Sequence, residues 1–325
     1  MIIQGRINRN VTMMMYSVLF FLSSCQPHDP FCFHHPHGAV RVEYDWTEAP
    51  DAGGVGGTTV HFYRSGDGRR VTTAHFTGRE GGSLYLGEGE YDVVACNNDT
   101  ERLHWRGTDS LPALETYTRD ASLTEELPGY SHGPIDGLVL TPDRLWSGHR
   151  ERVRVSRNDT TVILLVPRKV TYEVIWEVTG VRGAERVTAA AAGVSGVGGS
   201  LFLDGWRTDR HGALMSGVGS HLAGSAARSG SDSTGGFSGR FEVFGCPFRD
   251  TCRHVFTLYC WSRGGNVKAS FDVREQFHVV HEDRKIYIKL KADLEIPNGD
   301  GGESGSSGFV PDVDDWGEVN EDIIL

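Results

Sequence analysis

The sequence predicts an all-β protein with two tandem β-sandwiches and a flexible acidic C-terminal tail. Segments that alternate apolar and polar residues recur along the chain without helical patterns between them, which favours β-sandwiches over a parallel α/β fold. The predicted domain boundary is Val166-Pro167, which lies between two strand-rich halves of similar length. A Gly- and Ser-rich stretch then separates the second half from the acidic end.

These features divide the chain into five predicted parts. Residues 1–24 are a signal peptide, and residues 25–37 are a tether that leads into the first strand. Residues 38–166 form the N-terminal sandwich, and residues 167–297 form the C-terminal sandwich. Residues 298–325 are a linker and tail. A chain of 325 residues is long enough for two domains that each have a core.

The first half has several strand patterns. Residues 40–46 alternate apolar and charged side chains, which predicts a strand with one apolar face. Residues 83–86 and 91–96 flank a Gly-rich turn and are typical of a hairpin. Residues 160–166 are a continuous β-branched and leucine run, as expected for a strand buried on both faces.

The second half continues the pattern from residue 170 onward. Further strands are expected at residues 170–178, 237–244, 254–261, 271–273 and 286–296. Only residues 181–194, with four consecutive alanines, are a candidate for a short helix. Residues 193–239 are rich in Gly and Ser, which predicts a long loop or a strand pair with an excursion. Residues 299–308 read as a flexible linker.

The N-terminus predicts export. Arg6 and Arg9 precede a short apolar run that is too short to cross a bilayer and is typical of a secretory signal peptide. Leu22-Ser23-Ser24-Cys25 follows directly and resembles the lipobox of bacterial lipoproteins, in which the cysteine is acylated. We therefore expect lipidation at Cys25 and an outer-membrane lipoprotein, periplasmic or surface-exposed, held by its acyl chains. An ordinary cleaved signal with a chance cysteine is the alternative.

The acidic charge lies mainly in the tail. The net charge is −11, and eight acidic residues follow Pro297 without any Lys or Arg. Subtracting these eight leaves a net charge of −3 on the rest of the chain. Because the body has no basic patch, the sequence does not predict a nucleic-acid partner.

The cysteines do not pair evenly. Five of the six cysteines remain after Cys25, so at least one has no partner within the chain. Cys246 and Cys252 flank a short loop and are a candidate disulfide in an oxidising compartment. A buried unpaired thiol explains Cys32, Cys96 and Cys260 equally well.

Two histidine clusters raise the question of a metal site. Residues 32–37 contain one cysteine and three histidines, but an extended segment points them alternately to opposite faces, so at most two ligands converge. Zinc needs three or four protein ligands. His278 and His281 lie three apart among β-branched residues and would also face opposite sides. We therefore expect neither a metal nor a cofactor.

Sequence patterns of catalytic sites are also missing. No Gly-x-Ser-x-Gly motif stands between a strand and a helix, and Gly217-Val218-Gly219 has no βαβ context. Residues 97–100 lack the spacing of a calcium-binding loop. The sequence therefore predicts a protein that is not an enzyme.

Several short motifs carry a resemblance to a known family. They are CFHHPH, VRVEYDW and GEGEYDVVACNNDTE in the first half, and FEVFGC, HVFTLYCW and DVDDWGEV in the second. They resemble the fimbrillin-like lipoproteins of the Bacteroidales, a group of largely unknown function. That resemblance implies two transthyretin-like Greek-key sandwiches in series. It also implies kinship with fimbrial stalk, tip and anchor subunits, which polymerise by donating a strand to a neighbour.

The resemblance favours one role within such an assembly. Stalk subunits are usually trimmed after a basic residue in the first strand, and nothing marks Arg41 as a cleavage site. An anchor or accessory component of a fimbria-like surface assembly is therefore expected. The alternative is a surface binding module for a glycan or host ligand, using Trp105, Trp146 or Trp206. Exposed tryptophans in one groove would favour binding, and an open sheet edge beside the tail would favour assembly.

The tail, residues 309–325, could supply the donated strand. Its candidate pocket-filling residues are Val313, Trp316, Val319 and Ile323. A tethered segment of this kind can add a strand to an exposed sheet edge, in its own chain or in a fimbrial partner. A disordered acidic tail is the alternative, because eight acids resist burial and Pro311 interrupts the pairing.

Overall fold

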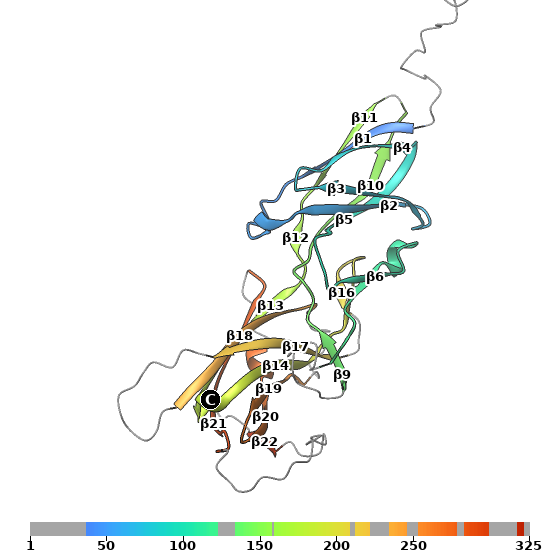
Figure 1. Ribbon diagram of the computed structural model, residues 1–325. Coiled ribbons are helices and arrows are strands. Elements are labelled where there is room, and N and C mark those ends of the chain that lie inside the picture. The colour runs from blue at the N-terminus through green and yellow to red at the C-terminus, as the bar shows by residue number, and fades with distance from the viewer. Residues whose placement is uncertain are drawn as a thin grey trace, which may run out of the picture.

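A computed structural model describes residues 37–122, 134–157, 159–208, 212–221, 234–245, 253–277, 283–298 and 317–321. These residues form an all-β protein, as predicted (Figure 1). The only helical elements among them are three single turns of 3-10 helix at Ala52–Gly54, Leu111–Ala113 and Ala184–Arg186, and the short helix α3 (Arg274–Phe277).

The strands fall on both sides of Pro167. In the first half they are β1 (His37–Tyr44), β2 (Gly57–Arg64), β3 (Arg70–Thr77), β4 (Gly82–Gly87), β5 (Gly89–Asn97), β6 (His104–Arg106), β7 (Glu115–Tyr117), β8 (Asp120–Ser122), β9 (Pro134–Leu140), β10 (Trp146–Val155) and β11 (Thr160–Leu165). In the second half they are β12 (Arg168–Lys169), β13 (Tyr172–Arg182), β14 (Val187–Gly198), β15 (Ser200–Phe202), β16 (Arg207–Thr208), β17 (Gly212–His221), β18 (Thr234–Val243), β19 (Val255–Ser262), β20 (Gly265–Asp272), β21 (Lys285–Glu295) and β22 (Gly317–Glu321).

Two sheets form the upper part of the molecule in Figure 1. Their strand orders are β11-β1-β4 and β12-β10-β5-β2-β3. The two sheets share one cluster of buried side chains, among them Val40, Val42, Phe62 and Ile163. In β1 the apolar residues Val40 and Val42 are buried while Arg41 between them is exposed, which is the alternation that the sequence predicts.

A larger sheet forms the lower part. Its order is β21-β13-β18-β17-β14-β19-β20-β22, with β9 added to β17 and β8 added to β9. A small sheet, β16-β15-β7-β6, joins strands from both halves of the chain. The larger core contains Trp176, Phe237 and Ile288 from the second half and also Tyr63 and Val94 from the first. The predicted boundary at residues 166 and 167 and the transthyretin-like Greek-key detail therefore stay predictions.

The same strand arrangement occurs twice. In the first half, β1 pairs in parallel with the last strand, β11, and antiparallel with β4. In the second half, β13 pairs in parallel with β21 and antiparallel with β18. The first and last long strands of each half therefore lie side by side, and β11 and β21 occupy equivalent places.

The structure corrects two expectations about local elements. Strands β4 and β5 do not form a hairpin, because β4 pairs with β1 while β5 pairs with β2 and β10 in the other sheet. Gly87 to Gly89 carry the chain from one sheet to the other. The four alanines do not form a helix but lie in β14, between β17 and β19. Ala190, Ala191 and Ala192 are buried there, so tertiary packing outweighs their helix propensity.

Strand β11 is also not buried on both faces. Ile163 and Leu165 are buried, but Val162 is 56% exposed and Leu164 is 48% exposed. A continuous apolar run does not by itself distinguish a central strand from an edge strand with an apolar outer row. In residues 193–239, predicted as a loop or strand pair, the described parts include β17 and β18, which pair with each other.

Candidate functional site

Strand β20 carries a strand from the tail along its edge. On one side β20 pairs antiparallel with β19, and on the other it pairs in parallel with β22. Val267, Ala269 and Phe271 of β20 are buried, with exposed fractions of 8%, 1% and 2%. Val319 lies at the register position of Ala269. Strand β22 therefore covers backbone groups of β20 that would otherwise form an open edge.

The tail residues predicted to fill pockets are only partly placed. Val319 belongs to β22, whereas Val313, Trp316 and Ile323 lie outside the described residues. Their role in a donated strand stays a prediction. The connection between β21 and β22, which contains the predicted linker, is also outside the described residues.

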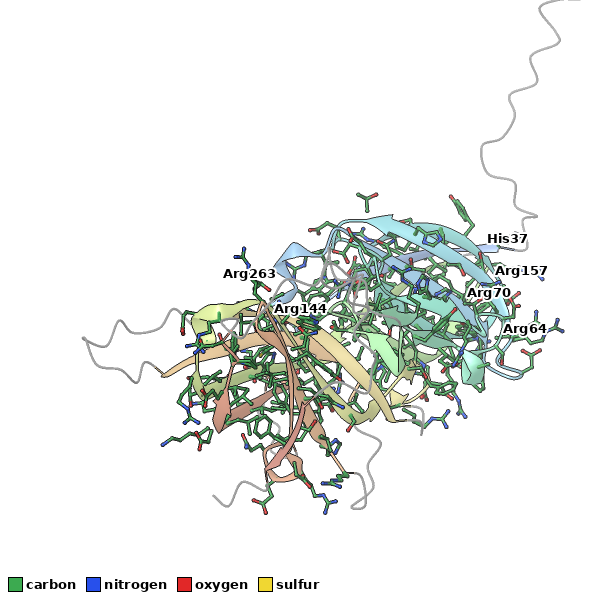
Figure 2. The ribbon with its side chains drawn as sticks, turned by 60° about the horizontal axis from the view of Figure 1, so that its bottom comes forward. His37, Arg64, Arg70, Arg144, Arg157 and Arg263 are labelled. Carbon is green, nitrogen blue, oxygen red and sulfur yellow. The ribbon has the colours of Figure 1, made fainter. Side chains whose placement is uncertain are left out.

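A buried ion-pair cluster joins the two halves of the chain. Lys169 Nζ lies 3.1 Å from Glu242 Oε1, and the side chains of these residues are only 8% and 10% exposed. Arg144 contacts both Glu242 and Glu173, with its Nε and Nη2 atoms each 3.1 Å from a carboxylate oxygen. The cluster thus connects the segment before β10 with β12, β13 and β18. Figure 2 shows Arg144 between the strands of the two halves.

Hydrogen bonds reinforce the same junction. The backbone N–H of Glu242 donates to Thr141 Oγ1, and the N–H of Leu145 donates to Thr171 Oγ1. Partial burial acts to lower the pKa of Arg144, but the carboxylates of Glu242 and Glu173 outweigh it and leave that pKa raised. Sequence reasoning missed this cluster, because Arg144 and Glu242 are 98 positions apart and neither belongs to a recognisable motif.

The three tryptophans proposed for ligand binding belong to the packed interior. Trp146 is buried, with 7% of its surface exposed, and its Nε1 donates to Asp51. Trp105 and Trp206 are partly buried and pack against the larger core. The guanidinium of Arg168 also lies over the Trp206 ring, 4.8 Å from its centroid. These side chains therefore do not form an exposed aromatic groove.

Other aromatic rings near the small sheet are covered in the same way. Arg106 lies over Tyr117 at 4.8 Å, and Arg207 lies over Phe202 at 5.7 Å. A guanidinium over a ring occupies the face on which a sugar would stack. Arg106 is held in turn by the buried carboxylate of Glu115. Hydrogen bonding from Arg106 lowers the pKa of Glu115.

The remaining predicted site residues are mostly not described. Cys25, Cys246 and Cys252 lie outside the described residues, so lipidation and the disulfide stay predictions. Cys96 and Cys260 are buried free thiols, and burial raises the pKa of each to about 12. His37 is exposed, while His278 and His281 are not described. Within the described ranges, no three His, Cys, Asp or Glu residues come together as metal ligands.

The described part of the chain has no helix of the length and apolarity that a membrane crossing needs.

Comparison with known proteins places the chain in a family. Residues 24–216, more than half of the chain, match the family described as a domain of unknown function, DUF5119. The chain belongs to this family. A curated relative from Bacteroides ovatus, named "Putative fimbrium anchoring subunit Fim4B", is 24% identical over 152 residues. That match covers 47% of this chain and 43% of the relative, so the chain spans less than half of that protein's length.

Solved structures share the fold. One described as "a putative adhesin" from Bacteroides ovatus has a TM-score of 0.59 and 17% identity, covering 89% of this chain and 99% of that one. The fimbrial anchor protein Mfa2 from Porphyromonas gingivalis has a TM-score of 0.51 and 14% identity, covering 78% of this chain and 90% of that one. The family match and these relatives confirm the resemblance to fimbrillin-like proteins of the Bacteroidales.

Proposed function

We propose that this protein is a lipid-anchored component of the cell envelope that serves a fimbria-like surface assembly as an anchor or accessory subunit. The observation that carries the proposal is the pairing of a tail strand with the edge of β20, beyond a Gly-rich stretch. An edge that accepts a strand from its own tail has the geometry of strand addition, in which main-chain hydrogen bonds supply the affinity.

Three further facts support this role. Relatives carry the names of a fimbrium anchoring subunit and a fimbrial anchor protein. Leu22 to Cys25 fits a lipoprotein acylation site, which would place the protein at the outer membrane. The relatives' names describe adhesins and fimbrial subunits rather than enzymes.

Within the proposal, the tail covers β20 when the subunit is alone and pairs with a neighbouring fimbrial subunit after assembly. A surface module that binds a glycan or host ligand is less well supported. Trp105, Trp146 and Trp206 pack into the interior, and arginines cover several of the remaining rings.

The test compares three forms of the protein in outer membranes isolated from a producing bacterium. They are the wild type, Cys25→Ala, and a truncation that removes residues 309–325. The wild type and the truncated form should incorporate a palmitate analogue, and Cys25→Ala should not. Envelope subunits should co-purify with the wild type and be lost from the truncated form.

A shorter truncation, removing residues 324–325, is the matched control because it keeps β22 and the candidate donor residue Ile323. It should retain the co-purifying subunits. Equal labelling of Cys25→Ala and wild type would overturn lipid anchoring. Retention of every envelope partner after removal of residues 309–325 would overturn the role of the tail.

A further inference from the structure

Strand β11 has an open edge with apolar side chains. Among the described residues its ladder partner is β1, so its other side forms the end of the sheet. The N–H of Asp45 donates to the carbonyl of Leu165, which fixes the backbone of Leu165 toward β1. Because peptide groups alternate along a parallel strand, Val162 and Leu164 direct their backbone groups to the open edge. Their side chains are also about half exposed, at 56% and 48%.

The equivalent strand of the second half is protected. Strand β21 pairs with β13 as β11 pairs with β1, and its buried row is likewise apolar. Its outward row, however, is mainly charged: Lys285, Lys289, Lys291, Asp293 and Glu295, with Tyr287 as the apolar exception. Charged side chains on an edge strand prevent pairing with other chains. Strand β20, another edge, is covered by β22. Within the part of the chain that the structure describes, strand β11 has neither form of protection.

We propose that β11 pairs antiparallel with β11 of a second copy of this protein. Residues 160–166 carry no charge, so an antiparallel approach places no like charges opposite each other. A two-fold axis at Ile163 sets Val162 opposite Leu164 of the second copy, and Leu164 opposite Val162. Both of these residues direct backbone groups to the seam, so this register satisfies donors and acceptors on both strands.

The neighbouring strand is compatible with this arrangement. Beside Val162 and Leu164, β1 places Arg41 and Glu43, whose side chains form an ion pair of 2.8 Å with each other. Their charges are therefore balanced within one copy and add no repulsion at the seam. The combined sheet would run β4-β1-β11 through the axis into the same strands of the second copy. Figure 1 places β11 at the periphery of the upper sheets, beside β1.

The interface is short, which sets the expected strength. Strand β11 has six residues, whereas stable interfaces bury about 1,200–2,000 Å². The dimer should therefore be weak in solution, and the fraction of protein that is dimeric should rise with protein concentration. This inference goes beyond the proposed function and does not depend on lipid anchoring or on strand donation.

Sedimentation equilibrium of the purified full chain over a wide concentration range tests the inference. The wild type should show a monomer–dimer equilibrium. Val162→Lys and Leu164→Lys, which copy the charged row of β21, should each raise the dissociation constant by about tenfold or more. Tyr287→Lys on β21 is the matched control, since Tyr287 is 38% exposed, and it should leave the equilibrium unchanged.

A cysteine pair tests the register independently. In the double variant Val162→Cys, Leu164→Cys, each new thiol lies opposite the other type in the second copy, so oxidation should give a covalent dimer. The matched double variant Tyr287→Cys, Lys289→Cys should stay uncrosslinked. A wild type that is monomeric at every concentration would overturn the inference, as would a dimer that Val162→Lys leaves intact.

Discussion

Replacing Glu242 by glutamine should strongly destabilise the protein. Glu242 is the carboxylate that neutralises Lys169, and both side chains are nearly inaccessible to solvent, at 10% and 8% exposure. Glutamine keeps the shape but removes the charge, so the ammonium group is left in a poorly solvated place without a counterion. Breaking a buried pair in this way costs about 3–5 kcal/mol of the free energy of unfolding.

The exposed fraction of each charged side chain predicts how much of the free energy of unfolding its variant loses. Arg144 is 41% exposed, so water can solvate its charge and its contact with Glu242 contributes less, about 1 kcal/mol. Arg144→Gln should therefore cost less than Glu242→Gln. The double variant Lys169→Met, Glu242→Leu replaces the pair by apolar groups and should recover most of the stability, because no unpaired charge remains.

Thermal and urea unfolding measure these differences. For a cooperatively unfolding unit of about 150–250 residues, 1 kcal/mol corresponds to about 2–4 °C, so Glu242→Gln should lower the Tm of such a unit by roughly 6–20 °C. Arg182→Gln is the surface control, because Arg182 and Asp293 form an ion pair with 43% and 73% exposed side chains. If Glu242→Gln loses no more stability than this control, the cluster is solvated and the reasoning fails.

Two further perturbations follow from single buried groups. Burial, aided by the charge of Arg70, lowers the pKa of His61 from 6.5 to about 4, so native His61 resists protonation. The contribution of neutral His61 to the free energy of unfolding should be complete above about pH 6.5 and should fall by up to about 3 kcal/mol as the pH drops toward 4. Urea unfolding midpoints measured across this pH range should show the decline in the wild type and lack it in His61→Phe. Gly239→Ala would place its Cβ 2.7 Å from Cζ2 of Trp176 and should cost about 1–3 kcal/mol in thermal melts. Gly54→Ala, with no atom within 4 Å, is its control, and equal melting of the two variants would contradict the packing argument.

Period-two patterns predicted strands well, because the alternation of side chains is a property of each strand alone. The alternating residues in β1, β13 and β21 lie in strands with one buried row. Pairing partners could not be predicted in the same way. The turn between β4 and β5 has the glycines of a hairpin, yet the chain passes to another sheet there. Local sequence does not contain that difference.

The candidate sites were predictable only where they depend on residues of one short segment of the sequence. The spacing of apolar residues indicated that the tail could form a strand, but nothing in it identified β20 as the partner. The ion-pair cluster depends on four residues brought together from distant segments. The open edge of β11 could not be predicted, because the residue types Val162 and Leu164 occur both in strands that a neighbour covers and in strands that it does not.

The edge strands β21 and β22 differ in the free energy that detaching them from the sheet would cost. This difference decides which of them can move to a neighbouring subunit. Strand β21 has eleven residues, with a buried row of Ile286, Ile288, Leu290, Ala292 and Leu294. Strand β22 has five residues, and its register sets Gly317 beside Val267 and the acidic Glu321 beside Phe271. A strand of five residues makes fewer main-chain hydrogen bonds with its neighbour than a strand of eleven residues does. Loss of β22 from its edge therefore costs less than loss of β21, and within the proposed function the tail is the strand suited to transfer.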